Sequence, residues 1–199
     1  TGFWGISVEY GGFFNRGKFE QKTLSLELQY MSKLSSWGRW RFRNFAKTNY
    51  LYGDSRLDSP ADQLTLHEHD YLGMAGFKSD RGLMGQQKLM FEYQLQSYTP
   101  YQFLGFRISP FFNAMAAAIG DNKKFIFNSN PIYTRFSLGV MLTNDYFVFN
   151  NIRFSLSYYP NIPGQGENLI KTNLIDNRDY QMMDFDFSKP NYIRWNRWD

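Results

Sequence analysis

Apolar and polar residues alternate along most of this chain with a period of two. The alternation is plainest in three segments, where apolar side chains occupy every second position: Trp4, Ile6, Val8 and Tyr10; Leu24, Leu26, Leu28 and Tyr30; and Leu89, Phe91, Tyr93 and Leu95. Successive side chains of a β-strand point to opposite faces, so each segment is predicted to be a strand with one apolar and one polar face. The apolar face would turn inward in a soluble sandwich and outward in a membrane barrel.

Eight strands are predicted from this pattern and from the turn residues between them. They cover residues 3–14, 22–31, 37–50, 86–98, 103–119, 131–143, 147–159 and 180–189. A weaker signal at 64–72 would add a ninth short strand. The predicted lengths meet or exceed the roughly 9–11 residues that a tilted transmembrane strand needs.

The predicted connections alternate in length. Short turns are expected at 32–36, 99–102 and 144–146, and longer loops at 15–21, 51–85, 120–130 and 160–179. The last of these loops contains Pro163-Gly164-Gln165-Gly166, which predicts flexibility. Short turns at one rim and long loops at the other are typical of an outer-membrane barrel whose long loops lie outside the cell. Both chain ends would then be periplasmic.

Composition favours the outward orientation of the apolar face. The 199 residues include 20 Phe and 14 Tyr, yet no run approaches the roughly 18 apolar residues of a membrane-spanning helix. Tyr and Trp gather near the ends of the predicted strands, as in interfacial aromatic girdles. We therefore predict an all-β fold, an antiparallel transmembrane β-barrel over 1–189 with an external loop at 51–85 and a periplasmic tail at 190–199. A soluble β-sandwich or lipocalin-like barrel is the alternative.

The two faces of the predicted strands can be assigned residue by residue. Lipid-facing residues are predicted to be Leu24, Leu26, Leu28, Trp40, Phe42, Phe91, Phe106, Ile108, Phe136, Leu138, Val140, Ile152, Phe154, Leu156, Phe185 and Phe187. Lumen-facing charged residues are predicted to be Glu9, Glu27, Arg39, Arg41, Arg43, Lys88, Glu92, Arg107, Arg135, Arg153, Asp184 and Asp186. A closed eight-stranded barrel is only just wide enough for side chains, so these charges would form a network, whereas half of a larger barrel would line a cavity.

One region carries a resemblance to a known superfamily. Residues 73–120 contain Gly76-Phe77, an acidic strand position at Glu92, and a run in which Gly105, Phe106 and Arg107 are followed by Pro110 and Phe111. This region resembles the C-terminal part of the outer-membrane assembly-factor superfamily: BamA- and TamA-like insertases, two-partner-secretion transporters and "bacterial surface antigen" barrels, in particular their Bacteroidetes branch. The resemblance implies a sixteen-stranded barrel, of which this chain would be the second half, and a long external loop that folds into the lumen.

Two positions depart from the family pattern. Ala75 stands where the loop motif has an Arg, and Met115 stands where the next strand has an Asp. In the family that Arg reaches lumenal carboxylates and pins the loop. Losing one partner would strand a charge in the lumen, whereas losing both removes that penalty. We therefore expect packing of Phe77 to hold the loop, and insertase or transporter activity becomes an open question.

Few residues point to catalysis, metal binding or nucleic acid. His67-Glu68-His69 is the only histidine cluster and lacks a third ligand at suitable spacing, and no Gly-x-Ser-x-Gly elbow occurs. We therefore expect no enzyme, no cofactor and no metal site. There is no cysteine, and the net charge of +4 is spread along the chain instead of gathered in one patch, so no nucleic-acid partner is expected.

The sequence thus predicts a barrel domain for protein insertion, secretion or anchoring in the outer membrane of a Gram-negative bacterium. Its expected partners are outer-membrane lipid and other outer-membrane or periplasmic proteins. One alternative is a closed eight-stranded anchor that binds an external partner through 51–85. Another is a small-solute channel, in which Arg39, Arg41 and Arg43 would line an anion-selective constriction. Phe185-Asp186-Phe187 resembles the aromatic ending that the assembly machinery reads, although further residues follow it.

Overall fold

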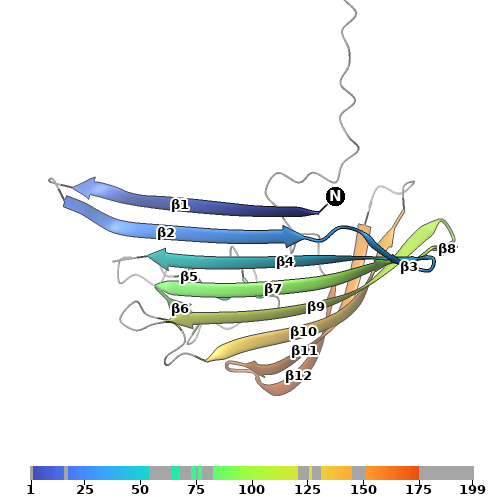
Figure 1. Ribbon diagram of the computed structural model, residues 1–199. Helices are drawn as coiled ribbons and strands as arrows, with labels where there is room; N and C mark the ends of the chain where they lie inside the picture. The colour runs from blue at the N-terminus through green and yellow to red at the C-terminus, as the bar shows by residue number, and fades with distance from the viewer. Residues whose placement is uncertain are drawn as a thin grey trace, which may run out of the picture.

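The fold is all-β and antiparallel, as predicted. The computed structural model describes residues 2–15, 18–53, 64–67, 73–74, 76–77, 83–120, 126, 131–144 and 151–174. Eight long strands form one sheet in which each strand pairs with the next: β1 (Phe3–Asn15), β2 (Lys18–Met31), β4 (Trp40–Gly53), β7 (Gln87–Tyr98), β9 (Phe106–Gly120), β10 (Ile132–Thr143), β11 (Asn151–Ile162) and β12 (Gly166–Leu174). The sheet curves strongly from β1 to β12 (Figure 1). Within the described residues, no helix is long and apolar enough to cross a membrane.

Four short strands complete the architecture. β3 (Ser35–Trp37) pairs with β4, and β8 (Gln102–Phe103) pairs with β9, so both extend long strands at the same end of the sheet (Figure 1). β5 (Leu64–Thr65) and β6 (Met84–Gly85) form a separate two-stranded ribbon. The sheet is open: its order begins at β1 and ends at β12, and these two strands do not pair with each other in the described part of the chain. The predicted closure of the sheet into a barrel is therefore not observed in the described residues.

The two ends of the sheet differ in their connections. We call the end with the β3–β4 and β8–β9 hairpins the hairpin rim, and the opposite end, where β4 leads into residues 54–86, the loop rim. At the hairpin rim, Trp37 pairs with Trp40 across a turn, and Phe103 pairs with Phe106 across another. The short predicted turns and the loop 51–85 thus fall at opposite ends of the sheet.

Seven of the predicted segments coincide with long strands to within a few residues, but two predicted loops are wrong. In place of a loop at 160–179, β11 turns directly into β12, and Gln165 N donates to Ile162 O at 3.0 Å. Gly164 has φ 75°, so the glycines make a tight hairpin there and not a flexible loop. In place of a loop at 15–21, Asn15 pairs with Lys18. Polar residues at both sites concealed the strands.

Other predicted segments have a partial or no counterpart. The weak strand signal at 64–72 corresponds to only two strand residues, Leu64 and Thr65. The predicted strand 180–189 and tail 190–199 lie outside the described residues, as do Ala75, Asp184, Phe185, Asp186 and Phe187.

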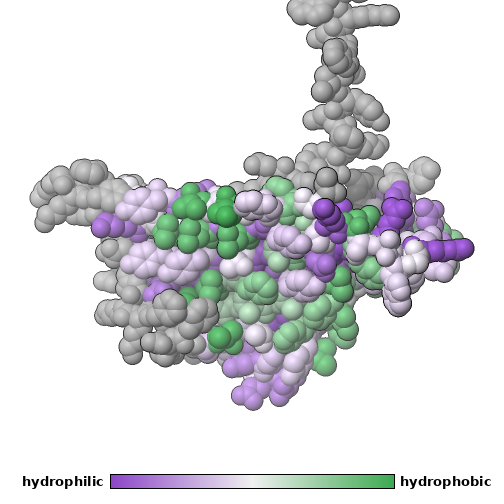
Figure 2. Space-filling view, viewed as in Figure 1, coloured by the Kyte–Doolittle hydropathy of each residue, from purple (hydrophilic) through white to green (hydrophobic). Residues whose placement is uncertain are grey.

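The outer face of the sheet is apolar and exposed. Among the predicted lipid-facing residues, seven are exposed: Leu28, Trp40, Phe91, Phe136, Leu138, Phe154 and Leu156. Leu24, Leu26 and Phe106 are half-buried on the same face. Apolar residues of neighbouring strands stand side by side there, at the pairs Ile6–Leu28, Leu26–Tyr50, Leu95–Phe112, Phe112–Leu138, Leu138–Leu156 and Tyr158–Ile170. Figure 2 shows hydrophobic residues gathered over β1 and β2. The register therefore joins the apolar positions into one band across the sheet.

The inner face carries the alternate positions and is mostly buried. Its polar members include Glu27, Glu92, Arg135 and Arg153. Gly139 on β10 leaves room there for the Phe111 ring of β9, because a Cβ at Gly139 would lie 2.4 Å from Phe111 Cζ and 2.4 Å from Phe154 O. A side chain at this position has no space without movement of either a buried ring or the β11 backbone.

Gly139→Ala is therefore expected to destabilise the protein by about 1–3 kcal/mol, the usual cost of overpacking. Gly5→Ala is the matched control, since the nearest atoms to its Cβ are the far end of the movable Phe3 ring, at 3.1 Å. Denaturant unfolding midpoints of the refolded proteins measure both effects. Equal midpoints for the two variants would contradict the position assigned to Phe111.

Candidate functional site

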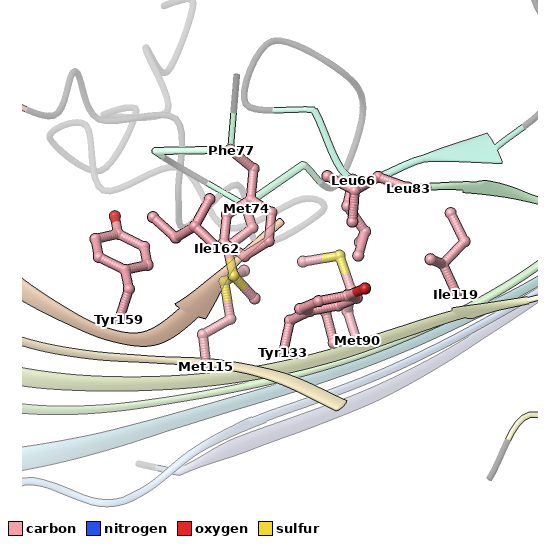
Figure 3. Packing of buried hydrophobic residues seen from close by; sticks show 11 residues of the cluster. Leu66, Met74, Phe77, Leu83, Met90, Met115, Ile119, Tyr133, Tyr159 and Ile162 are labelled. Carbon is pink, nitrogen blue, oxygen red and sulfur yellow. The ribbon is translucent and has the colours of Figure 1, made fainter. Parts of the chain in front are cut away.

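The candidate site is the inner face together with the segment that covers it. We call the described residues between β4 and β7 the plug. Four fully buried plug side chains pack onto this face: Leu66, Met74, Phe77 and Leu83. The sheet contributes the residues beneath them: Met90, Met115, Ala117, Ile119, Tyr133, Tyr159 and Ile162. Figure 3 shows the plug side chains pointing toward those of the sheet. Apolar contact thus seats the plug on β7, β9, β10 and β11.

Phe77 lies at the centre of this contact and is 0% exposed. Its ring meets Tyr133 edge-on, with the centroids 5.7 Å apart, and lies at a tilt to Tyr159, at 6.2 Å. Such aromatic pairs contribute about 0.5–1.5 kcal/mol each beyond the burial of area. The predicted role of Phe77 in holding the loop agrees with this arrangement.

Gly76 brings the plug backbone close against the sheet. Its φ is 91°, which L side chains rarely adopt, and a Cβ there would lie 2.6 Å from Tyr159 Oη. Its carbonyl accepts a hydrogen bond from Lys171 Nζ at 3.1 Å, and that ammonium lies 5.8 Å from the Tyr159 ring centroid. A cation on β12 thus holds the loop backbone, where the resembled family uses a cation on the loop to reach the wall.

A second lysine holds the other end of the plug. Lys88 on β7 is 1% exposed, and its Nζ donates to Thr65 O at 2.6 Å. Burying an ammonium group is costly unless acceptors replace water, and a loop carbonyl supplies one here. Lys88 and Lys171, both on strands of the sheet, therefore donate hydrogen bonds to main-chain oxygens of the plug.

The inner face also contains two buried carboxylates that accept hydrogen bonds from neighbouring side chains. Glu27 accepts from Asn49 Nδ2 at 2.7 Å, is 3.1 Å from Lys47 Nζ, and accepts from Gln29. Glu92 accepts from Asn113 Nδ2 at 2.7 Å. Each carboxylate therefore has hydrogen-bonding neighbours that compensate for the loss of water.

Two buried arginines extend this network across β9, β10 and β11. Arg135 Nη2 donates to Asn113 Oδ1 at 3.1 Å and lies 4.0 Å from Glu92 Oε1. Arg153 donates to Gln94 Oε1, and its guanidinium lies 4.1 Å from the centroid of the Phe111 ring. The Arg135–Asn113 hydrogen bond joins neighbouring strands, whereas Arg153 on β11 reaches Gln94 on β7, which is not its neighbour in the sheet. The polar network therefore joins β7, β9, β10 and β11, the strands on which the plug packs.

The predicted lumenal charges separate into two groups. Glu27, Lys88, Glu92, Arg135 and Arg153 are buried on the inner face, and Arg43 is half-buried. Arg41 and Arg107 are exposed at the hairpin rim, Arg39 lies in the exposed turn between β3 and β4, and Glu9 is exposed on β1. The arginine ladder of 39, 41 and 43 therefore runs out of the inner face onto the rim.

Two cations of the site were missed in the sequence, Lys171 and Lys47. Lys171 fell in a stretch predicted to be a loop, so its side chain had no assigned face. Lys47 continues the same alternate positions as Arg41 and Arg43, and this signal could have identified it. Met115, the departure from the family pattern, is buried under the plug and is the cross-strand neighbour of Glu92.

No site for metal chemistry is seen in what the structure describes. Among those residues, no three His, Cys, Asp or Glu side chains gather closely enough to hold a metal ion. Comparisons of the chain with protein-family models, curated proteins and solved structures gave no significant match.

Phe77→Ala should loosen the plug at a cost of about 3–5 kcal/mol, because it empties a fully buried aromatic site. Phe91→Ala on the outer face of β7 is the matched control and should cost less, since Phe91 is exposed. Denaturant midpoints give the stability, and the rate of tryptic cleavage at Lys78 and Arg81 in the folded protein reports release of the plug. Unchanged cleavage in the Phe77 variant would mean that this ring does not hold the plug.

Proposed function

We propose that this chain is a membrane-embedded β-barrel domain of the outer-membrane assembly-factor type, which serves protein insertion, secretion or anchoring with a plug seated on its inner face. One observation carries the proposal. The outer face of the sheet exposes a continuous apolar band, while charged residues such as Arg135 and Glu92 are buried on the inner face. This distribution is the reverse of that in a soluble sandwich, whose sheets bury their apolar faces.

The size of the apolar band fits a bilayer. Along β10, every outer position from Ile132 to Leu142 except Thr134 is apolar. At about 3.3 Å per residue and a tilt of about 40°, this run gives a band roughly 25 Å tall, the height expected for an outer-membrane barrel. Tyr30 and Trp4, at the hairpin-rim end of β2 and β1, stand where an aromatic girdle belongs.

Lipid contact requires the sheet to close. Backbone N–H and C=O groups cannot remain unpaired in the hydrocarbon region, so β1 and β12 must each find a strand partner. Pairing with each other would give a small barrel, and pairing with further strands would give the larger barrel that the resemblance implies. The second arrangement leaves more room for the plug, whose buried side chains already cover β7, β9, β10 and β11.

The seated plug argues against the two alternatives considered above. A small-solute channel needs an open lumen, yet Leu66, Met74 and Phe77 cover the inner face of β7, β9, β10 and β11. An anchor that binds an external partner through 51–85 needs that loop turned outward, yet these same side chains face the sheet (Figure 3). The plug thus favours a barrel whose inner face is covered over one with a permanently open lumen.

Leu138→Arg provides the direct test. Leu138 is 66% exposed in the middle of β10, so a charge there would meet lipid near mid-membrane and should cost about 2–4 kcal/mol. Leu104→Arg is the matched control: Leu104 is 81% exposed at the tip of the β8–β9 hairpin, where the cost should be near zero. Folding titrations into phosphatidylcholine vesicles measure both. Near-neutral effects at both positions, in a protein that folds without lipid, would overturn the proposal.

A further inference from the structure

The hairpin rim carries an unusual combination of exposed side chains. All three tryptophans of the described residues lie there: Trp4 at the start of β1, and Trp37 and Trp40 in the β3–β4 hairpin. Trp37 is 78% exposed, and Tyr101, Phe103 and Leu104 are exposed on the neighbouring β8–β9 hairpin. The turns are tight, with φ 61° at Gly38 and 80° at Gly105, so the exposed apolar side chains lie on short hairpins.

The charges on these two hairpins are all positive. Residues 30–44 and 98–108 contain five cations and no Asp or Glu: Lys33, Arg39, Arg41, Arg43 and Arg107. Lys33, Arg39, Arg41 and Arg107 are exposed. Aromatic side chains that accompany cations at the edge of an apolar band are typical of surfaces that meet lipid headgroups.

A cleft lies on the same rim. It has a volume of about 510 Å³ and is lined by the ends of β1 and β2 and by β3 and β4. Trp4 and Tyr30 form aromatic walls, and Lys33, Ser35 and Asn44 provide polar groups. A cation close to aromatic side chains suits a phosphate group joined to a glycerol and the upper part of an acyl chain.

We propose that the hairpin rim is a binding surface for the headgroup of an anionic phospholipid, with Lys33 in the cleft and Arg39 and Arg41 exposed in the β3–β4 hairpin. The inference rests on the proposed function, because it requires the apolar band to lie in a bilayer. Charge complementarity selects the occupant: an exposed surface with cations and no carboxylates in its two hairpins attracts an anionic leaflet, and the exposed rings insert at the level of the headgroups.

Headgroup preference can be read from tryptophan quenching by brominated lipids. In a Trp195→Phe/Trp198→Phe background, the remaining three tryptophans all report on the hairpin rim. This protein is folded into phosphatidylcholine vesicles that contain either brominated phosphatidylglycerol or brominated phosphatidylcholine. At low salt we expect phosphatidylglycerol to be preferred at least roughly fivefold, the contribution of about one cation near an anionic surface. High salt should remove the preference by screening.

The triple variant Lys33→Gln/Arg39→Gln/Arg41→Gln should quench equally with both lipids. The matched control is Lys22→Gln/Lys123→Gln/Lys124→Gln, which removes the same charge near the loop-rim end of β2 and after the end of β9 in sequence, and it should keep the preference. If the background protein does not fold, the two triple variants are compared in the full chain with its five tryptophans.

The outcomes separate the two proposals. Equal quenching by both lipids in the protein with an intact rim would overturn the inference and would point to an acidic protein as the partner of the rim, while the barrel proposal stands. A preference that both triple variants retain would also overturn it. Quenching by neither lipid would overturn the barrel proposal itself, and the lipid site with it.

Discussion

The contact between the plug and the inner face is the interaction on which the rest of this structure depends. The curved sheet turns Met90, Met115 and Tyr133 toward its inner side, and these apolar side chains need a cover. Phe77 and its neighbours supply it, and Gly76 permits the close approach because it has no Cβ to meet Tyr159. Without the plug, the inner face would expose apolar surface between buried charges. The polar network and the apolar cover therefore stabilise each other.

The strand alternation made most of the fold predictable. A period of two survives in any half-buried sheet, so the seven long strands β1, β2, β4, β7, β9, β10 and β11 could be placed from the sequence. β12 could not, because Leu169 and Ile170 are adjacent and break the alternation. Both are used in the structure: Leu169 packs against the inner cluster, and Ile170 is exposed on the outer face. A period-two search reads such a segment as a loop.

The candidate site was predictable only in its composition. Glu92, Arg135 and Arg153 could be assigned to one face from their positions, but the sequence gives no distances. The register between β9 and β10 brings Arg135 near Asn113, and Arg153 reaches Phe111 across the intervening β10. Lys171 donates a hydrogen bond to the main-chain oxygen of Gly76, a residue far from it in the sequence. A main-chain acceptor leaves no signature in the residue types, so pattern analysis could not find it.

The cationic side chains of this protein include a buried group on the inner face and an exposed group at the hairpin rim. Lys88 and Arg135 are buried, where Lys88 donates to the plug carbonyl of Thr65 and Arg135 donates to Asn113 of the neighbouring strand. Arg39 and Arg41 lie beyond the apolar band, where no desolvation is required and an anionic surface would attract them. Cationic side chains thus bind the plug and neighbouring strands on the inner face, and they are exposed at the hairpin rim. The change from buried to exposed cations occurs along β4. Arg43 is half-buried, whereas Arg41, which pairs with Ser36 in the β3–β4 hairpin, is exposed.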